Sequence, residues 1–355
     1  MMQTKIVYTL ISSAHDIYME QMLVSIFSLR HFTPEAYVAV VADNETGVRI
    51  EQWELLRGYV DEVIPVSFDA SVPNKERSRW IKTSLRNLVE GDFLFLDTDT
   101  VITADLSEID TINSEIAMVP DLHCRSFAEY PFQSVSRNIE YLFGRKISLD
   151  SPYYNSGVIL CKDTERTRQF FTEWHNTWLS KKDKRNGVYD QRSLGVVCEM
   201  TGMVEPLPDD YNCQVMASIK YLHTAKIVHF FNIKWSDEPK TLSPFFEESF
   251  YKQIKGKDCL SIEMQDEILH CKSSFSSSSM IVDKTDMCIW RTSVFRLIRK
   301  LYKQHKFIFR AMNKFSRLLL FVIRKIEQMG GVKACDDQLV IVLCQAVDYK
   351  LKIAA

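Results

Sequence analysis

The sequence predicts an α/β protein in which helices sandwich a mostly parallel sheet, with a basic helical extension at the C-terminus. In the first half of the chain, short runs rich in β-branched residues alternate with longer runs of helical spacing, which favours parallel strands joined by helical crossovers. The apolar content of 46% with 25% charged residues is typical of a globular protein. Residues 287–326 contain eleven Lys or Arg and no Asp or Glu, which sets the extension apart.

The first hundred residues supply most of the predicted sheet. The expected strands and the helices between them are, in order, 5–11 (strand), 15–31 (helix), 36–42 (strand), 51–57 (helix), 60–66 (strand), 76–89 (helix) and 93–96 (strand). In the first helix Met22, Ile26 and Leu29 share one face at helical spacing. The strands are short apolar runs, as expected of strands buried on both faces.

The second half is less regular. The expected elements are strands at 116–120, 154–161 and 225–231, a helix at 164–180 and an amphipathic stretch at 190–200. Residues 121–150 show no regular pattern and are expected to form a functional loop or lid. We expect a catalytic domain at 1–270, a Ser-rich linker at 271–284 and a basic amphipathic tail at 285–355.

Charge and cysteine usage exclude several classes of protein. The net charge of −2 combines +11 in residues 287–326 with −13 elsewhere, and an acidic body argues against nucleic-acid binding. The nine cysteines include no Cys-x-x-Cys pair, so neither a zinc site nor a disulfide framework is suggested, and a reducing cytosol is favoured. No apolar run approaches the ~20 residues of a transmembrane helix, and no signal peptide is expected.

The most informative motif is Asp97-Thr98-Asp99, the only Asp-x-Asp in the sequence, which directly follows the strand predicted at 93–96. Ligands bind at the carboxyl ends of strands in open α/β sheets. Two carboxylates on alternate positions there suit a divalent cation that keeps other coordination sites for diphosphate oxygens. An Asp-rich turn after a strand is common, and the motif alone is also compatible with it.

Three further motifs carry candidate functional residues. Asn155 and Gly157 precede a buried strand, where glycine permits close approach of the backbone to a ligand and the amide can bind a hydroxyl. A tight turn would have the same composition. Asp190-Gln191 opens the amphipathic stretch, where an Asp is also a common helix cap. His229 ends a buried strand and is either a core histidine or a third metal ligand.

In this order, over residues 4–236, the motifs resemble glycosyltransferase family 8, the retaining GT-A enzymes that include glycogenins and bacterial lipooligosaccharide galactosyltransferases. The resemblance implies a GT-A fold and Mn²⁺ (or Mg²⁺) held by Asp97, Asp99 and His229 against the diphosphate of a UDP-sugar. Other positions matching the family's donor site are Tyr8, Thr9, Ser12, Asp43, Lys82, Thr98 and Lys234. Positions around the transferred sugar are Asn155, Asp190 and Gln191.

The resemblance implies transfer of a hexose, glucose or galactose, to a glycan or lipid-linked saccharide in cell-surface polysaccharide or lipopolysaccharide synthesis. Retention could use Asp190 as a carboxylate nucleophile, or the acceptor could attack from the face that the diphosphate leaves, which we favour. One rival is a noncatalytic, membrane-attached glycan-binding scaffold. Another is a sugar-nucleotide nucleotidyltransferase, although residues 11–15 lack the glycine-rich loop such enzymes use.

The basic tail carries its own signal. From residue 290 to 326 apolar residues keep helical spacing, and the lysines and arginines occupy the remaining positions. A helix with one cationic and one apolar face suits an anionic membrane surface, so we expect peripheral attachment on the cytoplasmic face. The alternative is packing of the tail against the acidic body.

Overall fold

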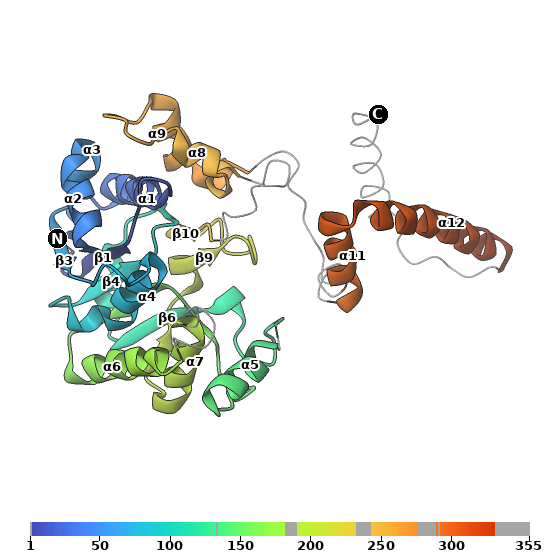
Figure 1. Ribbon diagram of the computed structural model, residues 1–355, viewed down its shortest axis with the longest axis horizontal. Helices are drawn as coiled ribbons and strands as arrows, with labels where there is room; N and C mark the ends of the chain where they lie inside the picture. Colours follow the sequence, from blue (N-terminus) through green and yellow to red (C-terminus); the bar gives the residue numbers. More distant parts are fainter. Residues whose placement is uncertain are drawn as a thin grey trace. The chain divides into compact units, whose positions relative to one another are not determined.

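The computed structural model describes residues 2–132, 134–181, 190–231, 243–275, 289 and 292–330 (Figure 1). The chain divides into two compact units, Met1–Ser279 and Met280–Ala355. The division falls within the residues expected to form a linker, of which 276–284 lie outside the described part of the chain. The first unit holds both sheets and the candidate site.

The main sheet has seven strands in the order β3-β2-β1-β4-β7-β6-β8. Their bounds are β1 Lys5–Leu10, β2 Val38–Asp43, β3 Glu62–Val66, β4 Phe93–Leu96, β6 Ile116–Pro120, β7 Tyr154–Cys161 and β8 Val204–Pro206. Within this sheet β7 runs antiparallel to both β4 and β6, and every other neighbouring pair is parallel. The predicted α/β class with a mostly parallel sheet is confirmed.

Helices cover both faces of this sheet. In the first unit they are α1 Tyr18–Phe32, α2 Asn44–Gln52, α3 Glu54–Arg57, α4 Asn74–Ser84, α5 Ser134–Phe143, α6 Glu165–Leu179, α7 Asp190–Thr201, α8 Glu248–Lys252 and α9 Ile262–Leu269. Short 3₁₀ turns are η1 Leu85–Asn87, η2 Ser107–Thr111, η3 Asp121–His123, η4 Asp209–Asn212, η5 Pro244–Phe246 and η6 Cys271–Ser273.

Alternate residues of the central strands enter two separate cores. Ile6 and Tyr8 of β1 pack with α1 in one core, whereas Val7 packs with α6 in the other. Figure 1 shows α1 and α6 on opposite sides of the sheet. Because the strands are buried on both faces, their apolar runs are continuous, as in the wholly buried β2 and β4. The edge strand β3, which carries Pro65, is only partly buried.

A second, three-stranded sheet brings a distant segment to the end of β4. It has the order β5-β10-β9, with bounds β5 Thr100–Ile102, β9 Cys213–Gln214 and β10 Ile227–His229. Thr100 pairs with His229 in register, and His229 pairs with Gln214. The amide of Phe230 donates to the carbonyl of Asp99 at 2.8 Å. The sheet therefore places His229 directly beside the Asp97-Thr98-Asp99 turn.

The sequence-based expectations were wrong at two places. The helix expected at 51–57 is two helices, and the first begins at Asn44 because the Asp43 carboxylate caps it by accepting from the Thr46 amide at 2.9 Å. Residues 121–150, expected to be irregular, contain α5. Their residues Phe127, Tyr130 and Ile139 also form a small core with Tyr153 and Val196.

The second unit contains α11 Ser293–Gln304 and α12 Lys306–Gly330. No side chain of either helix is buried within the part that the structure describes. Among all described helices, none is both long and apolar enough to cross a membrane.

Candidate metal centre and adjoining pocket

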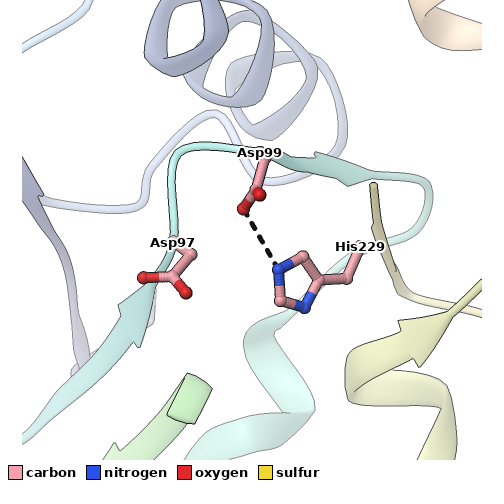
Figure 2. Close-up of side chains that lie close together, drawn as sticks. All are labelled: Asp97, Asp99 and His229. Carbon is pink, nitrogen blue, oxygen red and sulfur yellow. Dashed lines mark hydrogen bonds and ion pairs between the residues drawn. The ribbon is translucent and has the colours of Figure 1, made fainter. Parts of the chain in front are cut away.

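Three side chains from two strand ends converge at one point. Asp97 and Asp99 follow β4, and His229 ends β10 (Figure 2). The ligand atoms of all three lie within 4.8 Å of one another. The Asp99 Oδ1 atom is 3.1 Å from His229 Nε2. Two carboxylates and one imidazole at this separation form a donor set that suits Mn²⁺ and similar divalent cations.

The other nitrogen of His229 is held by an amide relay. His229 Nδ1 lies 3.0 Å from Asn212 Oδ1, and Asn212 Nδ2 donates to Asn155 Oδ1 at 3.0 Å. Because the Asn212 oxygen can only accept, Nδ1 carries a proton and donates it. The lone pair of neutral His229 therefore sits on Nε2, the atom that faces Asp99. This arrangement is typical of metal-binding histidines.

Without a cation, the triad is stabilised by charge. Burial by itself lowers the pKa of His229, but the ion pair with Asp99 outweighs it and raises that pKa. Burial acts to raise the pKa of Asp99, yet the facing His229 lowers it overall. Both shifts favour the imidazolium–carboxylate pair, and a bound cation would replace the proton on Nε2.

Gly157 makes room for the imidazole ring. A Cβ atom at this position would lie 2.2 Å from His229 Cε1 and 2.8 Å from Nδ1. Because β7 is antiparallel to β4, its first residues lie beside the end of β4, and the Gly157 carbonyl accepts from the Asp97 amide at 2.8 Å. Glycine is required here because the strand passes against the ring.

Lys82 of α4 pairs with the first aspartate. Its Nζ lies 2.8 Å from Asp97 Oδ1 and 3.0 Å from Oδ2. The same atom lies over the ring of Phe95, 5.0 Å from the ring centroid. Lys82 is 5% exposed, so its ammonium group is shielded from solvent. Sequence reasoning expected a basic residue near the donor, and the structure places it against a predicted metal ligand.

Asp190, in the first turn of α7, is paired with a cation that sequence reasoning missed. Arg79 Nε lies 3.1 Å from Asp190 Oδ1, and this carboxylate raises the pKa of the guanidinium. Arg79 precedes Lys82 by one helical turn, so α4 directs two cations toward two carboxylates. The Asp190 carbonyl accepts from Trp174 Nε1 at 2.8 Å, which fixes the start of α7.

Asp121 is a further carboxylate of the site, and sequence reasoning also missed it. Its Oδ1 accepts from Asn155 Nδ2 at 2.8 Å and its Oδ2 from the Tyr130 hydroxyl at 2.5 Å. Gln191 hydrogen-bonds to the same carboxylate. Burial raises the pKa of Asp121 in spite of these donors. A usable signal was present, since Asp121 directly follows the strand predicted at 116–120, as Asp97 follows its own strand.

These groups surround a pocket of about 290 Å³. Its lining residues are Asp97, Asp99, Asp121, Leu122, Tyr130, Phe132, Asn155, Ser156, Gly157, Gln191, His229 and Phe231. The lining thus combines polar groups with aromatic side chains. A concave site of this composition is typical of small-molecule binding.

Several predicted donor-site residues are not among those that line this pocket. Tyr8 is fully buried, with its hydroxyl 2.8 Å from Ser25 Oγ. The Asp43 carboxylate caps α2 and also accepts a hydrogen bond from Arg77 Nη1 at 2.8 Å. Ser12 Oγ donates to Asp16 Oδ1 at 2.7 Å, and Thr9 and Thr98 are partly exposed. Lys234 lies outside the described residues.

Solved structures with similar folds were found at low sequence identity. The bifunctional glycosyltransferase WbbM matches over 82% of this chain and 51% of its own, at 15% identity and a TM-score of 0.49. The galactosyltransferase LgtC, solved with donor and acceptor sugar analogues, matches over 74% of this chain and 100% of its own, at 14% identity and a TM-score of 0.48. GlyE of Streptococcus pneumoniae matches over 79% of this chain and 66% of its own, at 16% identity and a TM-score of 0.45.

No curated protein matches the chain by sequence. A protein-family model does match it, over residues 91–236, and that model is described as glycosyl transferase family 8. The matched stretch contains the metal triad, Asn155 and the Asp190-Gln191 pair, whereas positions before residue 91, such as Lys82, lie outside it. Residues 91–236 are therefore a domain of glycosyl transferase family 8.

Proposed function

We propose that this protein transfers a hexose, glucose or galactose, from a UDP-sugar to a glycan or lipid-linked saccharide with retention of configuration. The family match supports glycosyl transfer in general. The observation that carries the finer proposal is the Asp97–Asp99–His229 triad, which lines the pocket with its ligand atoms within 4.8 Å of one another. The proposed biological setting is synthesis of a cell-surface polysaccharide or lipopolysaccharide.

The triad and Lys82 would hold the leaving group. A divalent cation, Mn²⁺ or Mg²⁺, held by Asp97, Asp99 and His229 would neutralise charge that develops on the diphosphate as the sugar–phosphate bond breaks. Lys82 binds both oxygens of the Asp97 carboxylate and thereby fixes its orientation. Its buried ammonium adds a second positive charge beside Asp97.

Other amide and carboxylate groups that line the pocket would hold the sugar. Asn155, Gln191 and Asp121 are linked by hydrogen bonds and line the pocket together. They offer both donors and acceptors, which is what recognition of several sugar hydroxyls requires. Because the groups are already linked to one another, little ordering is needed when the donor binds.

The pairing of the carboxylates supports attack from the face that the diphosphate leaves. Asp190 is ion-paired with Arg79, and both oxygens of Asp121 already accept hydrogen bonds. Neither is a free nucleophile. In the proposed step the acceptor hydroxyl oxygen bonds to C1 as the C1–diphosphate bond breaks, and the hydroxyl proton passes to an oxygen of the leaving diphosphate. UDP and the glycosylated acceptor are the products.

Calorimetry with UDP tests the donor site without knowledge of the acceptor. We expect UDP to bind in the presence of Mn²⁺ and to lose most of its affinity when the metal is chelated. Asp99→Ala and His229→Ala should each abolish the metal-dependent part of the UDP affinity. Asp258→Ala, at an exposed position, is the matched control and should bind like the wild type. Metal-independent UDP binding, or none at all, would favour a scaffold over an enzyme.

We further propose that the second unit attaches the protein to an anionic membrane surface. Apolar side chains of α11 and α12 are exposed, among them Val294, Leu297, Phe307 and Phe315. Lysines and arginines occupy the intervening positions, and residues 287–326 include no acid. An apolar face combined with unbalanced positive charge suits anionic lipid headgroups, which are concentrated on the cytoplasmic leaflet. A lipid-linked acceptor would be met at such a surface.

A further inference from the structure

The turn that carries Asp121 has an unusual backbone. Leu122 and His123 have φ values of 54° and 57°, and among the described residues they are the two non-glycine positions with positive φ. A bulky side chain in this left-handed region is disfavoured, because its Cβ comes too close to the following carbonyl oxygen. Leu122 also lines the pocket. Some interaction must therefore hold this turn in place.

Gln214 makes three hydrogen bonds to the turn. Its Oε1 accepts from the Leu122 amide at 2.8 Å, and its Nε2 donates to the Pro120 carbonyl at 3.1 Å. The main-chain amide of Gln214 donates to His123 Nε2 at 3.2 Å. Gln214 is fully buried, so water does not replace any of these partners.

The same glutamine belongs to the sheet that positions the metal triad. In β9 it pairs in register with His229 of β10. Its main chain thus aligns with the strand of a proposed metal ligand, while its side chain holds the turn of Asp121. Gln214 therefore connects the strand that carries His229 with the turn that carries Asp121.

We propose that Gln214 is a positioning residue that holds the Leu122–His123 turn in its left-handed conformation and thereby keeps Asp121 against Asn155 in the sugar part of the pocket. This inference rests on the proposed glycosyl transfer. Loss of the amide lets the turn relax, which displaces Asp121 from the sugar. The metal triad and Lys82, which hold the diphosphate, keep their own contacts.

Steady-state kinetics of metal-dependent UDP release by the full-length protein separate the two parts of the site. Gln214→Leu keeps the side-chain volume and removes the side-chain hydrogen bonds. We expect kcat to fall about tenfold or more, because small displacements of positioned groups are costly, while KM for the donor and Mn²⁺ affinity stay near wild type. Gln21→Leu, which also replaces a buried glutamine, is the matched control and should leave kcat unchanged.

A second substitution tests the role of backbone conformation. Asparagine adopts the left-handed region far more readily than leucine. Leu122→Asn should therefore restore several-fold of the lost kcat in the Gln214→Leu background. A merely structural glutamine would show no such rescue. If Gln214→Leu does not fold, Gln214→Glu replaces it, since that side chain can still accept from Leu122 but cannot donate to Pro120 when ionised.

Amide hydrogen exchange keeps the inference separate from the proposed function. Exchange at the Asp121 amide, which donates to the Tyr153 carbonyl at 2.6 Å, should accelerate in Gln214→Leu and slow again in the double variant. Unchanged exchange would overturn the inference. So would a KM for the donor that rises as much as kcat falls, or a kcat that Leu122→Asn does not restore. A wild-type protein that releases no UDP would contradict the proposed glycosyl transfer alone, and the exchange measurement would still decide the role of Gln214.

Discussion

The proposed metal centre depends on residues that would not touch the ion. Asn212 sets which nitrogen of His229 carries the proton, and Gly157 leaves space for the ring. Both act through the imidazole, whose Nε2 atom faces Asp99. Substitution at these positions should therefore affect metal binding while Asp97 and Asp99 remain unchanged.

Replacement of Gly157 by alanine tests this dependence. The added Cβ would lie 2.2 Å from His229 Cε1, so the ring must move and the triad must open. We expect Gly157→Ala to weaken Mn²⁺ binding at least tenfold by calorimetry, about 1.4 kcal/mol. Gly47→Ala, where the nearest atom lies at 3.6 Å, is the matched control and should bind normally. Normal metal binding by Gly157→Ala would contradict the assignment of His229.

Metal binding should also depend on pH. The ion pair with Asp99 overcomes the effect of burial and raises the pKa of His229, so its Nε2 stays protonated to a higher pH than in an ordinary histidine. A protonated Nε2 cannot bind a cation. Mn²⁺ affinity should therefore fall as the pH drops through this raised pKa, and should be constant well above it. A calorimetric series that showed constant affinity across that range would exclude His229 as a ligand.

At the scale of elements, most of the strands were predictable, and three of the short ones were not. β1, β2, β4, β6 and β7 follow runs of buried residues, and the strands expected there are confirmed. β5, β8 and β9 have two or three residues each, and they exist because a tertiary partner lies alongside. β9 carries Gln214, so the missed strand is also the one that links the two halves of the site.

The helix α5 shows a different kind of miss. Val135, Ile139 and Phe143 recur at a spacing of four and pack into the small core of that segment. The helical signal was therefore present, but the surrounding aromatic and basic residues obscured it. The antiparallel direction of β7 left no local signal, since direction depends on the path of the chain between β6 and β7.

The start of α2 offers a stability test at this scale. Asp43 caps the helix through Thr46 and pairs with the buried Arg77. Asp43→Ala should lower the free energy of unfolding by about 3 kcal/mol or more, because a cap contributes about 1 kcal/mol and a buried cation is left unpaired. Thr164→Ala removes the cap of α6 and a hydrogen bond to Glu115 but leaves no buried cation unpaired, and it should cost about 1–2 kcal/mol. Equal losses in urea unfolding would show that the Arg77 pair contributes nothing.

At the scale of the whole molecule, contacts between distant segments decide which parts of the site could be predicted from the sequence. Asp97, Asp99, Asn155, Gln191 and His229 were named from local motifs, and all line one pocket. The ion pair of Arg79 with Asp190 was not foreseen, because no local pattern indicates which buried cation faces which carboxylate. The same holds for the network around Asp121, which joins three segments.

The second unit makes a prediction for the intact protein. Exposed Arg296, Lys300 and Lys314 lie on α11 and α12, so changing all three to Glu should strongly reduce binding to anionic vesicles without loss of UDP binding. The matched control changes Lys75, Arg145 and Lys257, exposed positions of the first unit, to Glu. Sedimentation with phosphatidylserine vesicles provides the measurement. Equal binding by both triple variants would argue that the tail has another partner.

The most direct test of the central claim is UDP release from a panel of UDP-sugars by the wild-type protein and by Asp99→Asn, each measured with Mn²⁺ and after chelation. The account predicts release from at least one UDP-hexose by the wild type with Mn²⁺. It also predicts loss of that release on chelation and a decrease of about a hundredfold or more in the variant. Release that persists in Asp99→Asn or without metal would contradict the claim that Asp97, Asp99 and His229 hold the donor through a divalent cation.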